Sequence, residues 1–345
     1  MTADTSAAVT KNGVASVAVL GAGSWGTALA LQLVRGDTRV LLWGRNPEHV
    51  AAMKVAGCNQ RFLPDVRFPD GLELEPVLEY AVRSSDEVLI VVPSHAFVEM
   101  VSQIEPWLRP GQGIAWACKG LEPGSGHFLH QAAMQSIGTD RPLAVVTGPS
   151  FAAEVAADLP TAVTVAGTDA HYCARIAQAL HGGNFRAYTS DDIVGAELGG
   201  AVKNVLAIAT GISDGMGFGN NARAALITRG LAEMMRLGRI LGAREQTLIG
   251  LAGMGDLVLT STGDLSRNRR LGLALGAGQS VAEAIAEIGQ VVEGVSTSEE
   301  VWRLAQRHGV EMPISEQING IIHKNWDPSR SVRELLSREQ KPENI

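Results

Sequence analysis

The chain has 345 residues, 46% of them apolar and 19% charged, a composition typical of a soluble globular protein with more than one domain. Its net charge of −7 and its lack of a long run of Lys and Arg exclude a surface built to follow nucleic acid. The three cysteines have no C-x-x-C spacing and are odd in number, which excludes a disulfide framework and a zinc site and indicates a reducing compartment.

The sequence divides into a leader and two domains. Residues 1–14 are rich in Ala, Thr and Ser and lack an apolar core, so we expect a disordered leader and no signal peptide. Strands alternate with helices up to about residue 190 and then give way to helices, which predicts an α/β domain over 15–190 and an α-helical domain over 191–345. The most apolar stretch, 193–212, contains Glu197 and Lys203, so we expect no membrane span and a cytoplasmic protein.

A glycine-rich turn follows the first expected strand, residues 17–20, and opens a helix of small residues. Gly21, Gly23 and Gly26 form the pattern G-x-G-x-x-G. In this pattern the first glycine permits a tight turn, the second lets the backbone approach a pyrophosphate, and the third lets the helix pack closely on the strand. The phosphates then bind the free N–H groups of the helix N-terminus. The segment predicts dinucleotide binding; the alternative is a turn with a structural role alone.

The first half predicts an open, parallel sheet. We expect strands at residues 17–20, 39–43, 87–92, 114–118, 143–147, 162–166 and 185–188. Polar or glycine-rich segments follow five of them, namely residues 21–23, 44–46, 93–95, 119–120 and 148–150. Because ligands bind beyond the carboxyl ends of parallel strands, we expect a site along this rim.

The residues after the second strand bear on the choice of cofactor. Sites for NAD usually place Asp or Glu there to bind the ribose 2′-hydroxyl, whereas this chain has Gly44, Arg45 and Asn46. An arginine can bind a 2′-phosphate through two parallel hydrogen bonds. We therefore predict that NADP(H) is preferred and that NAD(H) use is possible; the alternative is a solvated surface arginine.

Two later rim segments carry candidate ligand contacts. Lys119 follows the fourth strand, where it is either a ligand contact or an exposed lysine. The segment from Gly148 to Ala152 opens the next helix, whose free N–H groups suit an anion. We also interpret Ser150 as the N-cap of that helix.

In the second half, Lys203 and Asn204 interrupt an apolar helix. A buried lysine is costly unless it is paired or faces a polar cleft, and burial would lower its pKa toward the range useful for acid–base chemistry. The alternative is that Lys203 reaches solvent from the helix edge. Asp256 follows a glycine-rich turn and could enter a cleft beside Lys203.

Residues 266–268 supply the donors that a phosphate needs. Arg267 offers a guanidinium fork, and Ser266 and Asn268 offer single hydrogen bonds. The alternative is a solvated basic helix start, which we expect for Arg269 or Arg270 more than for Arg267. The sequence has no H-E-x-x-H motif or other metal-ligand spacing, so we expect no metal site.

Eight segments, in order and at consistent spacing, resemble the bacterial type of NAD(P)-dependent glycerol-3-phosphate dehydrogenase. They are GAGSWGTALA (21–30), LWGRN (42–46), ACKGLE (117–122), GPSFAAEVA (148–156), VKNVLAIATGI (202–212), GLAGMGDLVLT (250–260), LSRNRRLG (265–272) and VVEG (291–294). The resemblance implies an N-terminal Rossmann-like domain, an all-α C-terminal domain, a substrate held between them and a homodimer. It also implies reversible oxidation of sn-glycerol 3-phosphate to dihydroxyacetone phosphate, which supplies glycerol 3-phosphate for phospholipid synthesis.

The resemblance assigns roles to individual residues. Lys203 looks like the residue that transfers the proton, with Lys119, Asn204, Asp256 and Thr260 setting its charge and orienting the substrate. The implied substrate contacts are Lys119, Gly148, Ser150, Lys203, Asp256, Ser266, Arg267 and Asn268. The implied dinucleotide contacts are Gly21, Gly23, Ser24, Trp25, Gly26, Arg45, Lys119, Ala152, Arg267, Val291 and Glu293. Two alternatives are a dehydrogenase of hydroxy acids or ketoacids, which needs no phosphate site, and a non-catalytic NAD(P)-binding sensor.

Overall fold

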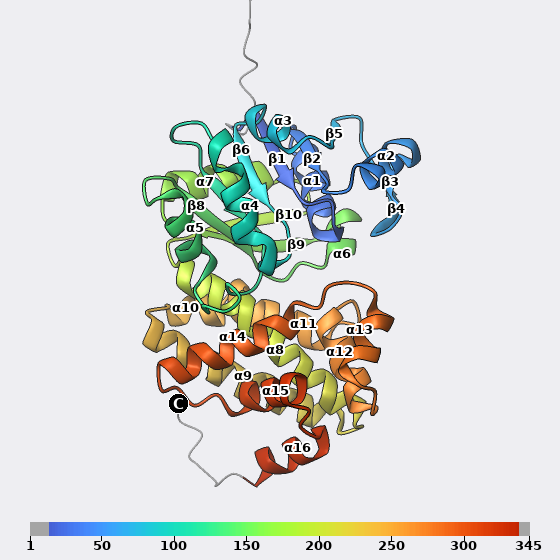
Figure 1. The fold of residues 1–345 in the computed structure, drawn as a ribbon, viewed down its shortest axis with the longest axis vertical. Helices are drawn as coiled ribbons and strands as arrows, with labels where there is room; N and C mark the ends of the chain where they lie inside the picture. The colour runs from blue at the N-terminus through green and yellow to red at the C-terminus, as the bar shows by residue number, and fades with distance from the viewer. Residues whose placement is uncertain (1–13, 338–345) are drawn as a thin grey trace, which may run out of the picture.

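A computed structural model describes residues 14–337 as an α/β domain followed by a helical domain (Figure 1). The expected leader therefore lies outside the described residues except for Val14, whose side chain is buried. The last strand of the sheet ends at Ser190 and the first helix of the second domain begins at Ile193. The expected fold class, a Rossmann-like domain joined to an α-helical domain, is confirmed.

The first domain is built on an eight-stranded sheet with the order β10-β9-β8-β7-β6-β1-β2-β5. The strands are β1 (Ser16–Leu20), β2 (Arg39–Trp43), β5 (Leu72–Glu75), β6 (Glu87–Ile90), β7 (Ile114–Trp116), β8 (Leu143–Thr147), β9 (Thr161–Gly167) and β10 (Phe185–Ser190). The chain runs outward from β1 to β2 and β5 and then returns to β6 on the other side of β1. This reversal of strand order opens a crevice beyond the end of β1, where such sheets bind ligands.

The expectation of a wholly parallel sheet is wrong for the last two strands. β9 runs antiparallel to β8, and β10 follows the direction of β9. The only helix between β8 and β9 is α6 (Ala152–Ala156), which has five residues. A helix of that length rises about 7–8 Å, less than half the length of the strand that it would have to cross back along. The rim at the end of β8 is unaffected by this reversal.

Three strands were not predicted, because they are short or polar. β3 (Cys58–Asn59) and β4 (Leu63–Arg67) form a separate hairpin, and β5 is an edge strand of sequence LELE. None has the apolar run that marks the central strands. Figure 1 shows the hairpin at the edge of the first domain, beside α2 (Pro47–Ala56).

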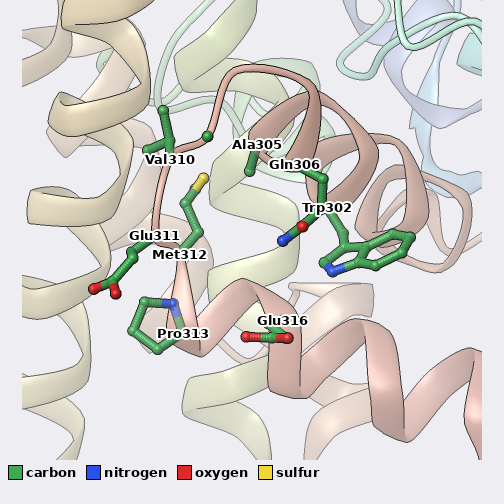
Figure 2. Close-up of a pocket in the computed structure, with 9 residues that line it drawn as sticks. Trp302, Ala305, Gln306, Val310, Glu311, Met312, Pro313 and Glu316 are labelled. Carbon is green, nitrogen blue, oxygen red and sulfur yellow. The ribbon is translucent and has the colours of Figure 1, made fainter.

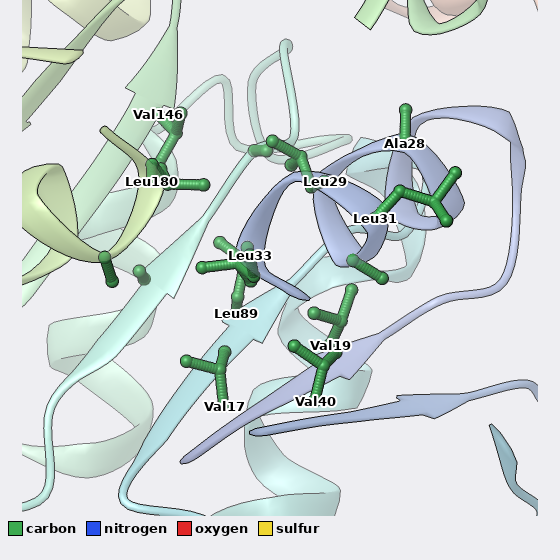
Figure 3. Close-up of a cluster of buried hydrophobic side chains, with 14 of the residues drawn as sticks. Val17, Val19, Ala28, Leu29, Leu31, Leu33, Val40, Leu89, Val146 and Leu180 are labelled. Carbon is green, nitrogen blue, oxygen red and sulfur yellow. The ribbon is translucent and has the colours of Figure 1, made fainter. Parts of the chain in front are cut away.

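Helices cover both faces of the sheet because alternate residues of the central strands are buried on opposite sides. Val17 and Val19 face one side, where they join a core with Leu29 and Leu33 of α1 (Figure 3). Ala18 and the other alternate residues pack against the second group of helices. The helices of this domain are α1 (Ser24–Arg35), α2, α3 (Leu78–Arg83), α4 (Phe97–Ile104), α5 (Leu129–Ile137), α6 and α7 (Ala170–Leu180).

The second domain surrounds one buried helix, α8 (Ile193–Gly215). The other helices are α9 (Gly219–Leu241), α10 (Glu245–Ile249), α11 (Asp256–Thr262), α12 (Arg267–Gly276), α13 (Val281–Ile288), α14 (Glu293–Arg307), α15 (Pro313–Lys324) and α16 (Pro328–Leu336). Among the described residues, α8 is the one helix long and apolar enough to cross a membrane, but 94% of its apolar window is buried inside the protein. It is therefore the core helix of this domain.

Small residues bring α8 and α12 into close contact. A Cβ added at Gly211 would lie 2.2 Å from the carbonyl oxygen of Arg269, and one at Gly272 would lie 2.2 Å from that of Ile208. Neither contact is sterically possible, so glycine is required at both positions for the backbones to approach. Lys203 lies on α8 and Arg267 begins α12, so this packing fixes the separation of two predicted site residues.

Candidate active site

A cleft of about 1440 Å³ lies between the carboxyl edge of the sheet and the helical domain. Residues from both domains line it, as the rim prediction and the two-domain layout require. Every predicted site residue lines this cleft except Gly148 and Asp256. Both of these bind Lys119, which does line it. The fold thus gathers residues that are far apart in the sequence into one place.

The glycine-rich turn has the geometry expected for a dinucleotide. Gly21 has φ +130°, and a Cβ there would lie 2.2 Å from the carbonyl oxygen of Val91. A Cβ on Gly26 would lie 1.8 Å from the oxygen of Gly21, whereas one on Gly23 would meet no atom within 4 Å. No side chain caps the N-terminus of α1, so its first N–H groups remain available to an anion. The turn therefore fits a pyrophosphate.

The end of β2 presents a cation to the cleft and no carboxylate. Arg45 is exposed and lines the cleft. The side-chain oxygen of Asn46 instead caps α2, accepting hydrogen bonds from the backbone N–H of Glu48 (2.9 Å) and His49 (3.3 Å). Arg45 is thus the charged group that an adenosine ribose would meet at this strand end.

One buried carboxylate joins two lysines at the centre of the cleft. Lys203 Nζ donates to Asp256 Oδ1 at 2.6 Å and to Thr260 Oγ1 at 2.9 Å. Lys119 Nζ donates to the other oxygen of Asp256 at 2.7 Å. Asp256 is only 1% exposed and the Lys203 side chain 8%. The expected contact between Asp256 and Lys203 is confirmed, and the alternative in which Lys203 reaches solvent is wrong.

The charges of this cluster tune one another. Burial lowers the pKa of Lys203 to about 8, with Asp256 opposing the change and Lys119 reinforcing it. Burial would raise the pKa of Asp256, but the two lysines outweigh it and hold that pKa below its usual value. Asp256 therefore stays ionised near neutral pH, while both protonation states of Lys203 are accessible. The expected downward pKa shift of Lys203 is confirmed.

The rim segment after β8 binds Lys119 from the other side. Lys119 Nζ donates to the carbonyl oxygen of Gly148 at 2.9 Å and approaches Ser150 Oγ at 3.4 Å. The interpretation of Ser150 as a helix N-cap is wrong, because α6 begins at Ala152 with Phe151 as its N-cap. The Ser150 hydroxyl instead donates to the Gly148 carbonyl, so it stabilises the rim segment itself.

Two asparagine side chains tie four elements together behind the lysines. Asn204 Nδ2 donates to the backbone oxygens of Lys119 (2.9 Å) and Gly200 (3.2 Å). Its oxygen accepts from Asn268 Nδ2 at 2.8 Å, and the Asn268 oxygen accepts from the Gly294 N–H at 2.9 Å. This chain of amides links the end of β7 to α8, α12 and α14.

Two arginines at the start of α12 point to different places: Arg267 lines the cleft, and Arg269 is buried in the helical domain. Arg267 lines the cleft and donates to the Val291 carbonyl oxygen at 2.7 Å, while Ser266 caps the helix by accepting from the Arg269 N–H. Arg270 is exposed, as expected for a solvated arginine, and it lies at the edge of the cleft lining. The same expectation is wrong for Arg269, which is buried against Asp214 at 2.8 Å. That pairing spans 55 positions, so no local pattern could indicate it.

The residues that the site prediction missed include a contact beside the cleft and a pair that lines it. Ser94, after β6, donates through its hydroxyl to Glu293 at 2.6 Å and joins the two domains. Burial raises the pKa of Glu293, although hydrogen bonds from Ser94 and the charge of Arg267 act to lower it. The position of Ser94 after a rim strand was a usable signal. The pair, Arg61 and Phe62 on the β3–β4 hairpin, gave none.

A separate cavity of about 280 Å³ lies between α14 and α15 (Figure 2). Trp302 and Gln306 of α14 and Glu316 of α15 line it, together with the loop that joins the two helices. It shares no lining residue with the large cleft. The predicted site residues therefore all belong to the cleft or to its immediate support.

The fold and the cleft define a two-domain oxidoreductase of the nicotinamide-dinucleotide-dependent class. Family models agree over most of the chain. The model described as NAD-dependent glycerol-3-phosphate dehydrogenase N-terminus matches residues 16–173, and the model of the C-terminus matches residues 192–333. The chain belongs to the NAD-dependent glycerol-3-phosphate dehydrogenase family.

Individual relatives match across nearly their whole length. A Xanthomonas campestris pv. campestris (strain B100) protein, named as an NAD(P)+ glycerol-3-phosphate dehydrogenase, is 57% identical over 95% of this chain and 96% of its own. A Xylella fastidiosa (strain M23) protein of the same name is 56% identical over 97% and 96%. The crystal structure of a Coxiella burnetii glycerol-3-phosphate dehydrogenase, 48% identical, superposes with a TM-score of 0.91 over 94% of this chain and 99% of that one.

Proposed function

We propose that this protein interconverts sn-glycerol 3-phosphate and dihydroxyacetone phosphate by hydride transfer, and that it supplies glycerol 3-phosphate for glycerophospholipid synthesis in the cytoplasm. The contact between Lys203 and Asp256 carries this proposal, because it places a lysine of altered pKa in the cleft that also holds the glycine turn. The relatives named for this activity support the choice of substrate.

Lys203 moves the proton in this scheme. The bound nicotinamide supplies or accepts the hydride at its C4. In reduction, the ammonium form of Lys203 donates a proton to the carbonyl oxygen of the substrate as its carbon gains the hydride. In oxidation, the neutral amine takes the hydroxyl proton. A pKa of about 8 suits both directions, since a catalytic group works best with a pKa near the working pH.

The neighbours of Lys203 aim and tune this proton transfer. An ammonium group has three N–H donors, and Asp256 and Thr260 bind two of them. One donor is left for the substrate oxygen. Asp256 keeps the pKa of Lys203 from falling further, while the charge of Lys119 pushes it down. Lys119, bound to Gly148 and close to Ser150, orients the substrate from the sheet side.

The start of α12 binds the substrate phosphate in this proposal. Arg267 lines the cleft, with one guanidinium N–H group on the Val291 carbonyl and its others available. Ser266 and Asn268 flank it at the helix N-terminus, where the dipole favours an anion. Asn268 is held by Asn204 and Gly294, so its role includes fixing the position of Arg267.

The dinucleotide lies along the other half of the cleft. Gly21, Gly23 and Gly26 hold the pyrophosphate at α1, and Arg45 favours NADP(H) over NAD(H). The remaining dinucleotide contacts are Ser24, Trp25, Lys119, Ala152, Arg267, Val291 and Glu293. We further propose that residues 15–190 and 191–345 act as the cofactor and substrate domains and that the protein is a homodimer.

The direct test is oxidation of NADPH and of NADH, followed by absorbance, with dihydroxyacetone phosphate as substrate. We expect turnover with both cofactors and a lower KM for NADPH. Dihydroxyacetone without phosphate and a 2-ketoacid serve as controls and should react far more slowly. Folded protein that turns over dihydroxyacetone phosphate with neither cofactor would contradict the proposal, and preference for the ketoacid would favour the other dehydrogenase class.

A further inference from the structure

The β3–β4 hairpin is anchored to the dinucleotide-binding turn. Asn59 is fully buried, and its Nδ2 donates to the Ala22 carbonyl oxygen at 3.1 Å and to Thr27 Oγ1 at 2.8 Å. Ala22 lies between the first two glycines of the turn, and Thr27 lies in the first turns of α1. The hairpin is thus held against the segment that fits the pyrophosphate.

The tip of the hairpin faces the end of β2. Arg61 and Phe62 form the tip, and the Arg61 guanidinium carbon lies 5.2 Å from the centroid of the Phe62 ring. Phe62 in turn meets the His49 ring edge-on, with 5.9 Å between centroids. His49 belongs to α2, which Asn46 caps beside Arg45. Stacking on an aromatic face restrains a guanidinium without neutralising it.

Two cations therefore share this end of the cleft. Arg45 and Arg61 both line it, and neither forms an ion pair with a carboxylate in residues 14–337. The carboxylates that line the cleft, Glu99, Asp264 and Glu293, belong to other elements. Glu48 of α2 and Asp65 of β4 are exposed and outside the lining. A ribose hydroxyl would leave both charges unmatched, whereas a phosphate on that ribose would match them.

We propose that Arg61 is a second cofactor-specificity residue, which binds the adenosine 2′-phosphate together with Arg45. This inference rests on the proposed preference for NADP(H) and names a partner for Arg45 that lies outside the strands of the main sheet. The hairpin supplies Arg61 from one side of the phosphate and the end of β2 supplies Arg45 from the other. Phe62 holds the Arg61 guanidinium in place for this contact.

The test measures binding of adenosine 2′,5′-bisphosphate and of adenosine 5′-monophosphate to the full chain by calorimetry. The wild type should bind the bisphosphate more tightly. Arg61→Ala should weaken bisphosphate binding by about tenfold, the effect of losing one charge-assisted hydrogen bond, and leave the monophosphate unchanged. The affinity of Arg61→Lys for the bisphosphate should lie between those of the wild type and Arg61→Ala. Arg83→Ala removes one exposed cation outside the cleft and should change neither affinity.

Three outcomes would overturn parts of this account, and they can be told apart. Equal binding of the two nucleotides by the wild type would reject the NADP(H) preference together with the role of Arg61. A loss of bisphosphate binding in Arg45→Ala but not in Arg61→Ala would reject Arg61 alone. Equal weakening of both nucleotides in Arg61→Ala, with an unchanged melting temperature, would show that the hairpin contacts adenosine and does not bind the 2′-phosphate.

Discussion

The halves of the cleft that we propose for cofactor and substrate are built in different ways. At the pyrophosphate, the cofactor half uses backbone: a turn of glycines and the uncapped start of α1, all within a few neighbouring residues. The substrate half uses side chains brought together from afar, since Asp256 lies 53 positions from Lys203 and 137 from Lys119. Local sequence therefore determines the glycine turn, whereas only the packed helical domain brings Asp256 to the two lysines.

The substrate half also carries the greater electrostatic cost. Burying an ion pair is unfavourable unless the geometry is good and the remaining donors are bound. Here one carboxylate serves two ammonium groups, and Thr260 and the Gly148 carbonyl bind further donors. The lowered pKa of Lys203 shows that these contacts only partly offset burial. The same imbalance suits Lys203 to the proton transfer that we propose for it.

The variant Lys203→Ala should have the largest effect, and it should affect the chemistry without affecting cofactor binding. Proton transfer by a positioned group contributes about 10²–10⁴-fold to rate, so we expect kcat with dihydroxyacetone phosphate to fall about a thousandfold. NADPH affinity, measured by fluorescence titration, should stay within about twofold, because the glycine turn is untouched. A near-normal kcat in Lys203→Ala would contradict its role in proton transfer. A loss of NADPH affinity as large as the loss of kcat would show that the two halves of the cleft do not act separately.

Arg267→Ala tests the phosphate end of the substrate half. Removing a charge-assisted contact costs about 1.5–3 kcal/mol, so KM for dihydroxyacetone phosphate should rise roughly ten- to a hundredfold. Steady-state kinetics with saturating NADPH would measure this rise. Arg239→Ala removes an exposed arginine of α9 that does not line the cleft, so it is the control and should change KM by less than about twofold. Equal effects of the two variants would reject a specific role for Arg267.

A pair of glycine variants tests the cofactor half, with smaller expected effects. At Gly23 an added methyl group meets no protein atom, so Gly23→Ala should keep the melting temperature and weaken NADPH binding by about tenfold. At Gly26 the methyl group would lie 1.8 Å from the Gly21 oxygen, so Gly26→Ala should lower both the melting temperature and the affinity. Thermal melts and NADPH titrations would distinguish them. Unchanged NADPH affinity in Gly23→Ala would contradict backbone contact with the pyrophosphate.

The features that could be predicted were those with local causes. Apolar runs marked the central strands, and the rim after each one pointed to the cleft. The direction of β9 could not be predicted that way, because it depends on the short α6 failing to span the sheet. The pairing of Arg269 with Asp214 and the position of Arg61 depend on contacts between distant segments. Ser150 was misassigned by a local rule, since its hydroxyl binds Gly148 instead of the helix.

If Lys203 transfers the proton, the kcat values of reduction and of oxidation should depend on pH in opposite ways. Reduction uses the ammonium form, so its kcat should fall as pH rises through about 8, and the kcat of oxidation should rise over the same range. Asp256 raises the pKa of Lys203. Asp256→Asn should therefore move both profiles to lower pH.

The central claim is that burial beside Asp256 makes Lys203 an acid–base group near neutral pH. Its pKa can be measured directly by NMR titration of the protein labelled with ¹³C-lysine, with the Lys203 signal assigned by its loss in Lys203→Arg. The structure predicts a pKa of about 8. A value at or above the ordinary lysine pKa of 10.5 would contradict the account, because the neutral amine would then be almost absent at the working pH.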